Sequence, residues 1–367
     1  MNNGELTFKI LPLAQMKEDG SPIDIEQIRS ICAEGLSKYP PEDRLIAWGL
    51  LIGSLPEQAE EWPQHRAKLY TEYKNFMNEF GLNSYENKIF PNSTGITDFG
   101  LSDNHIMGII HGDIIRTGHH LHYLPFPDET VYSNYKNKNI NSEFQYIGEN
   151  FEDDDNKLLP FHVHMRRIER ILYIFAKLNR TLSYMQGFNE IVTVLYYVST
   201  EALNFFYGNF LEIETFVFYT FQRIISSTEL NELFTTQDHS SLIHKKLGQL
   251  MNTISRHFPE ASHIINKMNI HPLQFCYRRL NLLFAQDQDI PNLMIVWDAI
   301  FAHFNELVEF EFYLILAHVK LVEPLIDGED YSQTMIALQK LNVCDPKKLV
   351  DWANKFWEID HRKTNSK

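Results

Sequence analysis

The stretch Pro291-Asn-Leu-Met-Ile-Val-Trp-Asp-Ala-Ile-Phe-Ala-His-Phe304 carries its apolar side chains at intervals of three and four residues. This spacing places them on one face of an α-helix, and a proline suits the first turn. The pattern recurs at Leu45, Trp48, Ile52 and Leu55, at Ile168, Ile171, Leu172 and Phe175, and at Ile191, Val194, Leu195 and Val198. Runs that alternate with a period of two residues are scarce. The sequence therefore predicts an all-α fold of many short to medium helices joined by compact loops.

Two polar stretches interrupt this pattern. Helical periodicity is weakest at about residues 118–160, which contain prolines, an Asn-, Lys- and Tyr-rich run and an acidic cluster. We interpret this stretch as a surface insertion and not as a separate domain. A second polar stretch, from Ser226 to His239, is expected to separate two helical lobes. The predicted organisation is an N-terminal segment (1–24), one helical domain (25–360) that contains the insertion, and a C-terminal tail (361–367).

The overall composition narrows the classes of partner. A formal net charge of −15 over 367 residues argues against nucleic acid as the main partner and against electrostatic adhesion to anionic membranes. The most apolar stretch is interrupted by polar residues, so we expect no direct membrane insertion. The N-terminus lacks the features of a signal peptide, and three scattered cysteines fit a reducing compartment. These observations predict a cytoplasmic protein that is recruited to membranes only through a partner.

The common enzyme signatures are absent from the sequence. It contains no phosphate-binding loop followed by Lys and Ser or Thr, no His-Glu-x-x-His and no Gly-x-Ser-x-Gly. Two histidine-rich spots, His119-His120-Leu-His122 and His162-Val-His164, have no carboxylate at an obvious ligand spacing. We interpret these histidines as solvated loop residues and expect no metal site.

Two short motifs bear on function. In Ile110-His-Gly-Asp-Ile-Ile-Arg-Thr117, an acid three residues before an arginine can hold its guanidinium on the same side of a helical turn. Judged alone, this pattern is typical of a surface ion pair worth roughly 0–1 kcal/mol. Tyr184-Met-Gln-Gly187, also judged alone, is typical of a turn before a helix, in which glycine eases the backbone.

Together and in this order, the two motifs resemble the signature of the TBC-domain family, which activates Rab GTPases. The first, Ile-x-x-Asp-x-x-Arg-Thr, is complete, and the second, Tyr-x-Gln-Gly-Met, has Phe188 in place of Met. Three further stretches resemble the family. Arg44 to Trp48 resembles its Arg-x-x-x-Trp helix, and Phe175 to Asn179 resembles the residues that precede its second motif. Trp297-Asp298 resembles its Trp-Asp pair. Arg279 stands where the family usually has Trp. The 66 residues between Thr117 and Tyr184 place the insertion between the motifs, as in short, TBC-only family members.

The resemblance implies an all-α TBC fold with two helical lobes and a groove that carries the finger residues. It implies a Rab GTPase activator, not an enzyme by itself, that regulates vesicle trafficking. Arg116 would act as an arginine finger and Gln186 as a glutamine finger, both supplied in trans. The supporting residues implied are Asp113, Thr117, Tyr184, Gly187 and Asn189. The chain would have no cofactor of its own, because the partner Rab GTPase binds the GTP and Mg²⁺.

Two alternatives stay open at this point. The chain could be a non-catalytic Rab-binding scaffold or effector with a TBC fold, a hypothesis motivated by Phe188, Arg279 and the insertion. It could also be a helical interaction protein whose motif matches are accidental, in which case Arg116 and Gln186 would lie far apart. Because Phe188 is also bulky and apolar, we expect the local packing to adjust to it and the chemistry to survive. Arg279 is expected to alter either the packing or a partner-facing surface.

Overall fold

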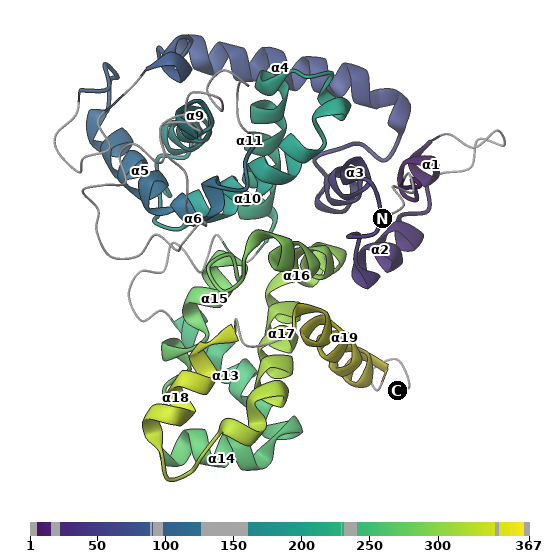
Figure 1. The fold of residues 1–367 in the computed structure, drawn as a ribbon, viewed down its shortest axis with the longest axis vertical. Helices are drawn as coiled ribbons and strands as arrows, with labels where there is room; N and C mark the ends of the chain where they lie inside the picture. The colour runs from purple at the N-terminus through teal and green to yellow at the C-terminus, as the bar shows by residue number, and fades with distance from the viewer. Residues whose placement is uncertain are drawn as a thin grey trace, which may run out of the picture. The chain divides into compact units, whose positions relative to one another are not determined.

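The computed structural model describes residues 6–15, 23–88, 90, 98–125, 161–228, 230, 241–341 and 345–362, without the side chains of 241–243. Helices account for its regular structure and no strand occurs among these residues, which confirms the predicted all-α fold (Figure 1). The α-helices are α1 (Leu11–Ala14), α2 (Ile25–Glu34), α3 (Pro41–Ile52), α4 (Trp62–Glu79), α5 (Asn104–Arg116), α6 (Gly118–Leu121), α9 (His162–Leu178), α10 (Phe188–Glu201), α11 (Phe210–Ser227), α13 (Ser241–His257), α14 (Pro259–Lys267), α15 (Tyr277–Leu282), α16 (Ile290–Ala302), α17 (Leu307–Val322), α18 (Tyr331–Gln339) and α19 (Pro346–Arg362). Short 3₁₀ helices lie at Ala59–Glu61, Tyr85–Asn87, Leu203–Phe206, Pro272–Gln274, Phe304–Glu306 and Glu323–Leu325.

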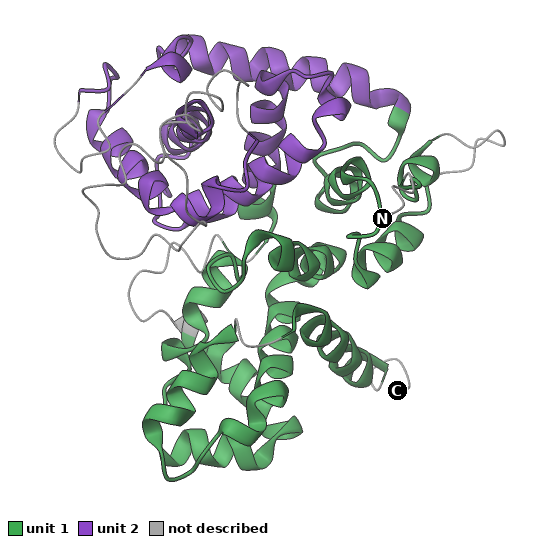
Figure 2. Cartoon of the chain, in the orientation of Figure 1, with its two compact units in different colours: residues 1–59, 223–367 green, residues 60–222 purple. Residues whose placement is uncertain are grey.

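The chain divides into two compact units (Figure 2). Unit 1 comprises residues 1–59 and 223–367, and unit 2 comprises residues 60–222. The second boundary lies inside α11, a few residues before the polar stretch expected to separate two lobes, and most of that stretch lies outside the described residues. Two lobes are therefore present, but the N-terminal helices belong with the C-terminal half of the chain.

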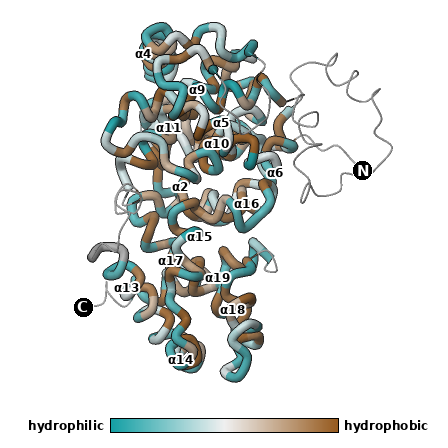
Figure 3. Tube along the Cα trace, turned by 90° about the vertical axis from the view of Figure 1, so that its left-hand side faces the viewer, coloured by the Kyte–Doolittle hydropathy of each residue, from teal (hydrophilic) through white to brown (hydrophobic). Residues whose placement is uncertain are grey.

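Most of the expected insertion, residues 126–160, lies outside the described part of the chain. Its first residues are described and include α6, where His120 and Leu121 are buried. Hydrophobic and hydrophilic residues alternate along the helices of both units (Figure 3), as expected when each helix buries one face. None of the described helices is long and apolar enough to cross a membrane.

Unit 1 is organised around α16, which packs against α2 and α3. The fully buried Asp298 of α16 accepts hydrogen bonds from Arg44 Nε at 2.9 Å, from Trp48 Nε1 at 3.0 Å and from the backbone N–H of Leu36 at 2.8 Å. Burial raises the pKa of Asp298, and the Arg44 guanidinium opposes that shift. The Arg-x-x-x-Trp and Trp-Asp elements, far apart in sequence, are thus one hydrogen-bonded cluster.

Arg279 is buried in unit 1 and is not part of a partner-facing surface. Its guanidinium donates to the backbone oxygen of Leu338 at 2.8 Å and to that of Gln339 at 2.7 Å. It also pairs with Asp287 at 3.3 Å and donates to His318 Nδ1 at 3.0 Å. Arg279 therefore alters the packing, because it satisfies backbone acceptors that an indole could not reach with one N–H.

Unit 2 is built around α9, which contacts α4, α5 and α10 and runs through the middle of the unit (Figure 1). Two of its arginines are buried with carboxylates: Arg166 pairs with Glu169, and Arg170 Nε donates to Glu214 at 3.0 Å. Glu169 also accepts from Tyr85 at 2.8 Å. These contacts bond α9 to α11 and to the 3₁₀ helix Tyr85–Asn87.

The interpretation of the histidines as solvated loop residues is wrong for His120 and His164. His120 lies in α6 and His164 in α9, and neither side chain is exposed. His164 Nδ1 lies 2.9 Å from the Tyr196 hydroxyl, and its Nε2 lies 2.7 Å from the carbonyl oxygen of Pro125. Burial lowers the pKa of His164 to about 4, so the ring is neutral at physiological pH.

Glu311 is buried in α17, and neither of its carboxylate oxygens has a hydrogen-bond partner among the described residues. Burial alone raises its pKa well above the ordinary value. The folded state therefore keeps its proton at pH values where the unfolded state has released it, so stability falls as the pH rises above about 4.3, the unfolded value.

We expect Glu311→Gln, which removes the titration and keeps the shape, to stabilise unit 1 relative to the parent chain. The difference should be near zero below about pH 4 and grow by up to about 1.4 kcal/mol per pH unit above it, up to the folded pKa. Urea unfolding of both chains at several pH values measures it. Glu309→Gln, at an exposed position of the same helix, is the control and should show no such trend. A pH-independent difference for Glu311→Gln would contradict the expectation.

Candidate functional site

The first motif occupies the end of α5. Asp103 caps the start of this helix by accepting from the Ile106 N–H at 3.1 Å, and Met107, Ile110 and Ile114 of the helix are buried. Arg116 is the last residue of α5, and its side chain is 50% exposed. The helix ends at Thr117, whose N–H donates to the Asp113 carbonyl at 3.0 Å. The arginine therefore projects from a rigid helical end.

The second motif occupies the turn before α10. Gly187 is the N-cap of α10 and is buried, with a φ of 107°. Because a side chain at this φ would be strained, the turn requires glycine here. Gln186 precedes it and is exposed. Gly187 therefore has a local backbone role in this turn.

A buried carboxylate connects the two motifs. Asp113 pairs with Arg116 through Oδ1, and its Oδ2 lies 2.8 Å from the hydroxyl of Tyr184. Asp113 is 3% exposed. Burial, and then the negative charge of Asp113, raises the pKa of Tyr184 well above its ordinary value. The hydroxyl therefore stays protonated and donates, which holds Asp113 in position behind Arg116.

Asn189 completes the connection from the first turn of α10. Its side-chain amide donates to Thr117 Oγ1 at 2.6 Å, and its Oδ1 accepts from the backbone N–H of Gly187 at 3.0 Å. Thr117 in turn donates to the Asp113 carbonyl at 2.9 Å. One side chain is thus bonded to the residue after Arg116 and to the residue after Gln186.

The structure brings the residues implied by the resemblance together in unit 2. Six of them are linked by these contacts, and Gln186 directly precedes Gly187, whose N–H is bonded to Asn189. This arrangement does not fit accidental motif matches, which would leave Arg116 and Gln186 far apart. Phe188 is fully buried and packs edge-to-face on Phe175 at 5.6 Å and Phe221 at 5.1 Å between ring centroids. A bulky apolar residue is therefore accommodated at this position.

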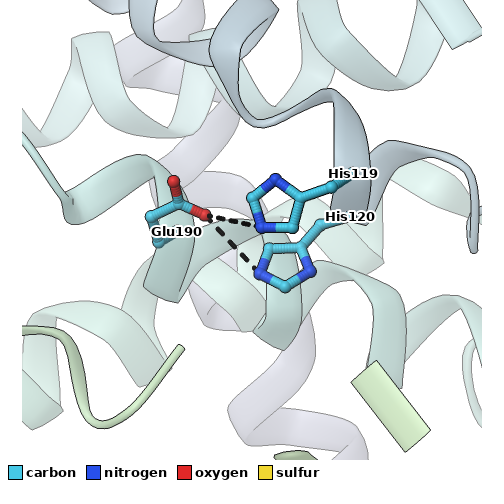
Figure 4. Close-up of side chains that lie close together, drawn as sticks. All are labelled: His119, His120 and Glu190. Atoms are coloured by element: carbon cyan, nitrogen blue, oxygen red, sulfur yellow. Dashed lines mark ion pairs between the residues drawn. The ribbon is translucent and has the colours of Figure 1, made fainter. Parts of the chain in front are cut away.

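Sequence reasoning missed a cluster beside this network. His119 and His120 of α6 face the carboxylate of Glu190 in α10 (Figure 4). Glu190 Oε2 lies 3.9 Å from His119 Nε2 and 3.5 Å from His120 Nε2. The sequence did contain the adjacent histidines, but their carboxylate comes from a helix far along the chain, so no local spacing could reveal it.

Removing the Tyr184 hydroxyl tests the connection between the motifs. We expect Tyr184→Phe to lower the free energy of unfolding of unit 2 by about 1–3 kcal/mol, because a buried hydrogen bond to a charged group is lost. Chemical denaturation followed by circular dichroism measures this. Tyr207→Phe is the matched control: Tyr207 is 88% exposed, and its loss of a hydroxyl should change stability by less than about 0.5 kcal/mol. If both substitutions changed the free energy of unfolding equally, the Tyr184 hydroxyl would not stabilise the connection between the two motifs.

Comparisons with known proteins agree with this arrangement. The family model of the Rab-GTPase-TBC domain matches residues 113–326. Human TBC1 domain family member 13 is 30% identical over 196 residues, which are 53% of this chain and 48% of that protein. GTPase-activating protein GYP7 of Saccharomyces cerevisiae is 26% identical over 168 residues, which are 46% of this chain and 20% of that protein. The crystal structure of the Ypt/Rab-GAP domain of Gyp1p has a TM-score of 0.64 to this chain at 16% identity, covering 95% of this chain and 98% of that one.

The comparisons support different conclusions about fold and family. At 16% identity, the likeness to the Gyp1p domain shows a shared fold alone. The chain spans about half the length of the human relative and a smaller share of the yeast one. The family match covers more than half of the chain and includes Arg116, Gln186 and the residues that connect them. The chain therefore belongs to the Rab-GTPase-TBC domain family.

Proposed function

We propose that this chain is a GTPase-activating protein for a Rab-family small GTPase, and that it supplies Arg116 and Gln186 in trans to the active site of that GTPase. Family membership and the name of the yeast relative GYP7 support an activator role. The observation that carries the mechanism is the buried network, in which Asp113, Tyr184 and Asn189 hold the end of α5 against the start of α10. Two side chains with the required chemistry are thereby presented from one rigid base.

The reaction needs charge neutralisation and an oriented water. GTP hydrolysis spreads negative charge over the oxygens of the transferred phosphoryl group, and an arginine supplied in trans stabilises that charge. A guanidinium has five N–H donors in a planar fork, so the pairing of Arg116 with Asp113 leaves donors for phosphate oxygens. The ion pair also restricts the rotamers of Arg116 before the partner arrives, which reduces the entropy lost on docking.

Gln186 would act on the water. A glutamine amide both donates and accepts, so it can orient a water in line with the phosphate. Gln186 lies one residue before Gly187, and the hydrogen bond from the Gly187 N–H to Asn189 holds the turn from which the Gln186 side chain projects. The chain needs no nucleotide or metal site for this reaction, because the GTPase holds both GTP and Mg²⁺. In the cell, such an activator would act from the cytoplasm in vesicle trafficking, recruited to endomembranes by its partners.

Single-turnover hydrolysis tests the proposal. A panel of purified Rab GTPases loaded with GTP is mixed with increasing amounts of the chain, and phosphate release is followed alongside binding. Faster hydrolysis by at least one Rab is the expected result. Saturable binding with no change in rate would instead favour a TBC-fold scaffold or effector. The absence of both binding and acceleration across the panel would contradict a Rab-directed function.

A further inference from the structure

Three potential ligand atoms converge beside the network that connects the two motifs. They come from adjacent positions of α6, His119 and His120, and from the first turn of α10, Glu190 (Figure 4). The ligand atoms of the three residues all lie within 4.8 Å of one another. His120 and Glu190 are buried, at 0% and 4% exposure, and the side chain of His119 is 48% exposed. The cluster is thus anchored in the interior of unit 2 and open to solvent on one side.

The distances fit shared coordination better than direct hydrogen bonding. The Nε2 atoms of His119 and His120 approach the same carboxylate oxygen at 3.9 and 3.5 Å, longer than the 2.7–3.2 Å typical of an N–H···O hydrogen bond. Bonds of about 2.0–2.1 Å to a tetrahedral Zn²⁺ place neighbouring ligand atoms about 3.3 Å apart. Small side-chain shifts would therefore bring all three atoms to coordination distance.

We propose that His119, His120 and Glu190 bind one Zn²⁺ or a similar first-row divalent cation. Two imidazole nitrogens and one carboxylate oxygen form a recognised zinc ligand set, in which water occupies the fourth position. Ca²⁺ and Mg²⁺ prefer sites made of oxygen atoms, so two imidazoles select against them. The half-exposed His119 gives the ion a route from solvent.

The bound ion would join two elements that carry the candidate site. His119 lies two residues after Thr117, and Glu190 follows Asn189, so the ion would reinforce the 2.6 Å hydrogen bond between Asn189 and Thr117. Metal binding to the folded state stabilises that state by mass action. We therefore expect the ion to order the segment after Arg116. Any resulting change in the stimulation of a GTPase rests on the proposed function, whereas the binding itself does not.

Metal titration of the untagged 367-residue chain tests the site without any GTPase. Zn²⁺ is titrated in competition with a chromophoric chelator, and Co²⁺ is added separately to record its visible absorption. We expect one Zn²⁺ per chain at this site, a Co²⁺ spectrum of low-coordinate, nitrogen- and oxygen-ligated type, a higher midpoint of thermal unfolding with Zn²⁺, and no competition from Mg²⁺ or Ca²⁺.

His119→Ala is the principal variant, because its exposed side chain can be removed without a cavity in the core. It should weaken Zn²⁺ binding at least about tenfold, since even the loss of an outer partner of a ligand costs about 10–100-fold. Glu190→Gln should do the same while keeping its shape. His105→Ala, at an exposed position of α5, is the matched control and should bind like the parent. Zn²⁺ binding that is undetectable in the parent, or equally tight in His119→Ala and Glu190→Gln, would overturn the proposal.

Discussion

Replacing Arg116 by alanine is expected to lower the stimulation of GTP hydrolysis by the responsive Rab GTPase at least about tenfold, a loss of about 1.4 kcal/mol of transition-state stabilisation or more. The loss could reach about 10³-fold, the lower value associated with an arginine finger. The physical reason is that alanine leaves the developing charge on the phosphoryl oxygens without its planar, permanently charged partner. Single-turnover phosphate release at saturating concentrations of each variant measures the effect on the chemical step.

Gln186→Ala should also lower stimulation at least about tenfold, because the attacking water is no longer oriented.

Arg116→Lys separates the effect of charge from that of geometry. It keeps the positive charge but loses the planar fork, so it should recover only part of the activity. Arg362→Ala is the matched control, since Arg362 is exposed and pairs with Glu358 on its own helix, much as Arg116 pairs with Asp113. It should stimulate like the parent.

Measurements of binding to the GTPase and circular dichroism spectra distinguish the loss of a catalytic side chain from unfolding of the protein. Both finger variants should keep the parent spectrum, because their side chains are exposed or half-exposed. If Arg116→Ala and Gln186→Ala accelerated hydrolysis as well as the parent does, the two-finger mechanism would be wrong, even for a chain that activates a Rab.

Asp298→Asn is expected to cost unit 1 about 3 kcal/mol or more of folding free energy. The buried carboxylate accepts from Arg44, Trp48 and the Leu36 backbone, and the asparagine amide can replace only part of this acceptor capacity. Arg44, which is 15% exposed, would also lose its counter-charge in a largely buried environment. Urea unfolding followed by tryptophan fluorescence reports the loss, because Trp48 and Trp297 flank the cluster.

The control lies in the same part of the sequence. Asp289 is exposed at the N-cap of α16 and makes no side-chain capping hydrogen bond. Asp289→Ala should therefore change stability by no more than about 0.5 kcal/mol. A similarly small effect of Asp298→Asn would mean that the Arg-x-x-x-Trp and Trp-Asp elements are not held together by this carboxylate.

Local sequence patterns were sufficient to predict the fold class and four of the helices. The apolar spacing from Leu293 to Phe301 lies within α16, and the spacings at Ile168 and Ile191 lie within α9 and α10. The stretch predicted from Leu45 to Leu55 was right in type but too long: α3 ends at Ile52, because Gly53 adopts a left-handed conformation with a φ of 81°. These features follow from residues within a few positions of one another.

The two motifs were also recognisable in the sequence, but their connection was not. The order of Asp113, Arg116, Tyr184 and Gln186 indicated the family, whereas the bonds that hold Asp113 to Tyr184 and Thr117 to Asn189 join residues about 70 positions apart. Judged by spacing alone, Asp113 and Arg116 were a routine surface ion pair. Burial of the carboxylate and its second partner give that pair a fixed orientation.

Only the tertiary structure decided the environment of the polar residues. It buried His120 and brought the carboxylate of Glu190 to it, placed Arg279 among backbone carbonyls inside unit 1, and left Glu311 buried without a partner among the described residues. The sequence by itself determined where helices form and which residues carry the family signature, because backbone hydrogen bonds and apolar periodicity are local. The protonation and partners of buried polar groups depend on contacts between distant segments, and no spacing along the chain specifies those contacts.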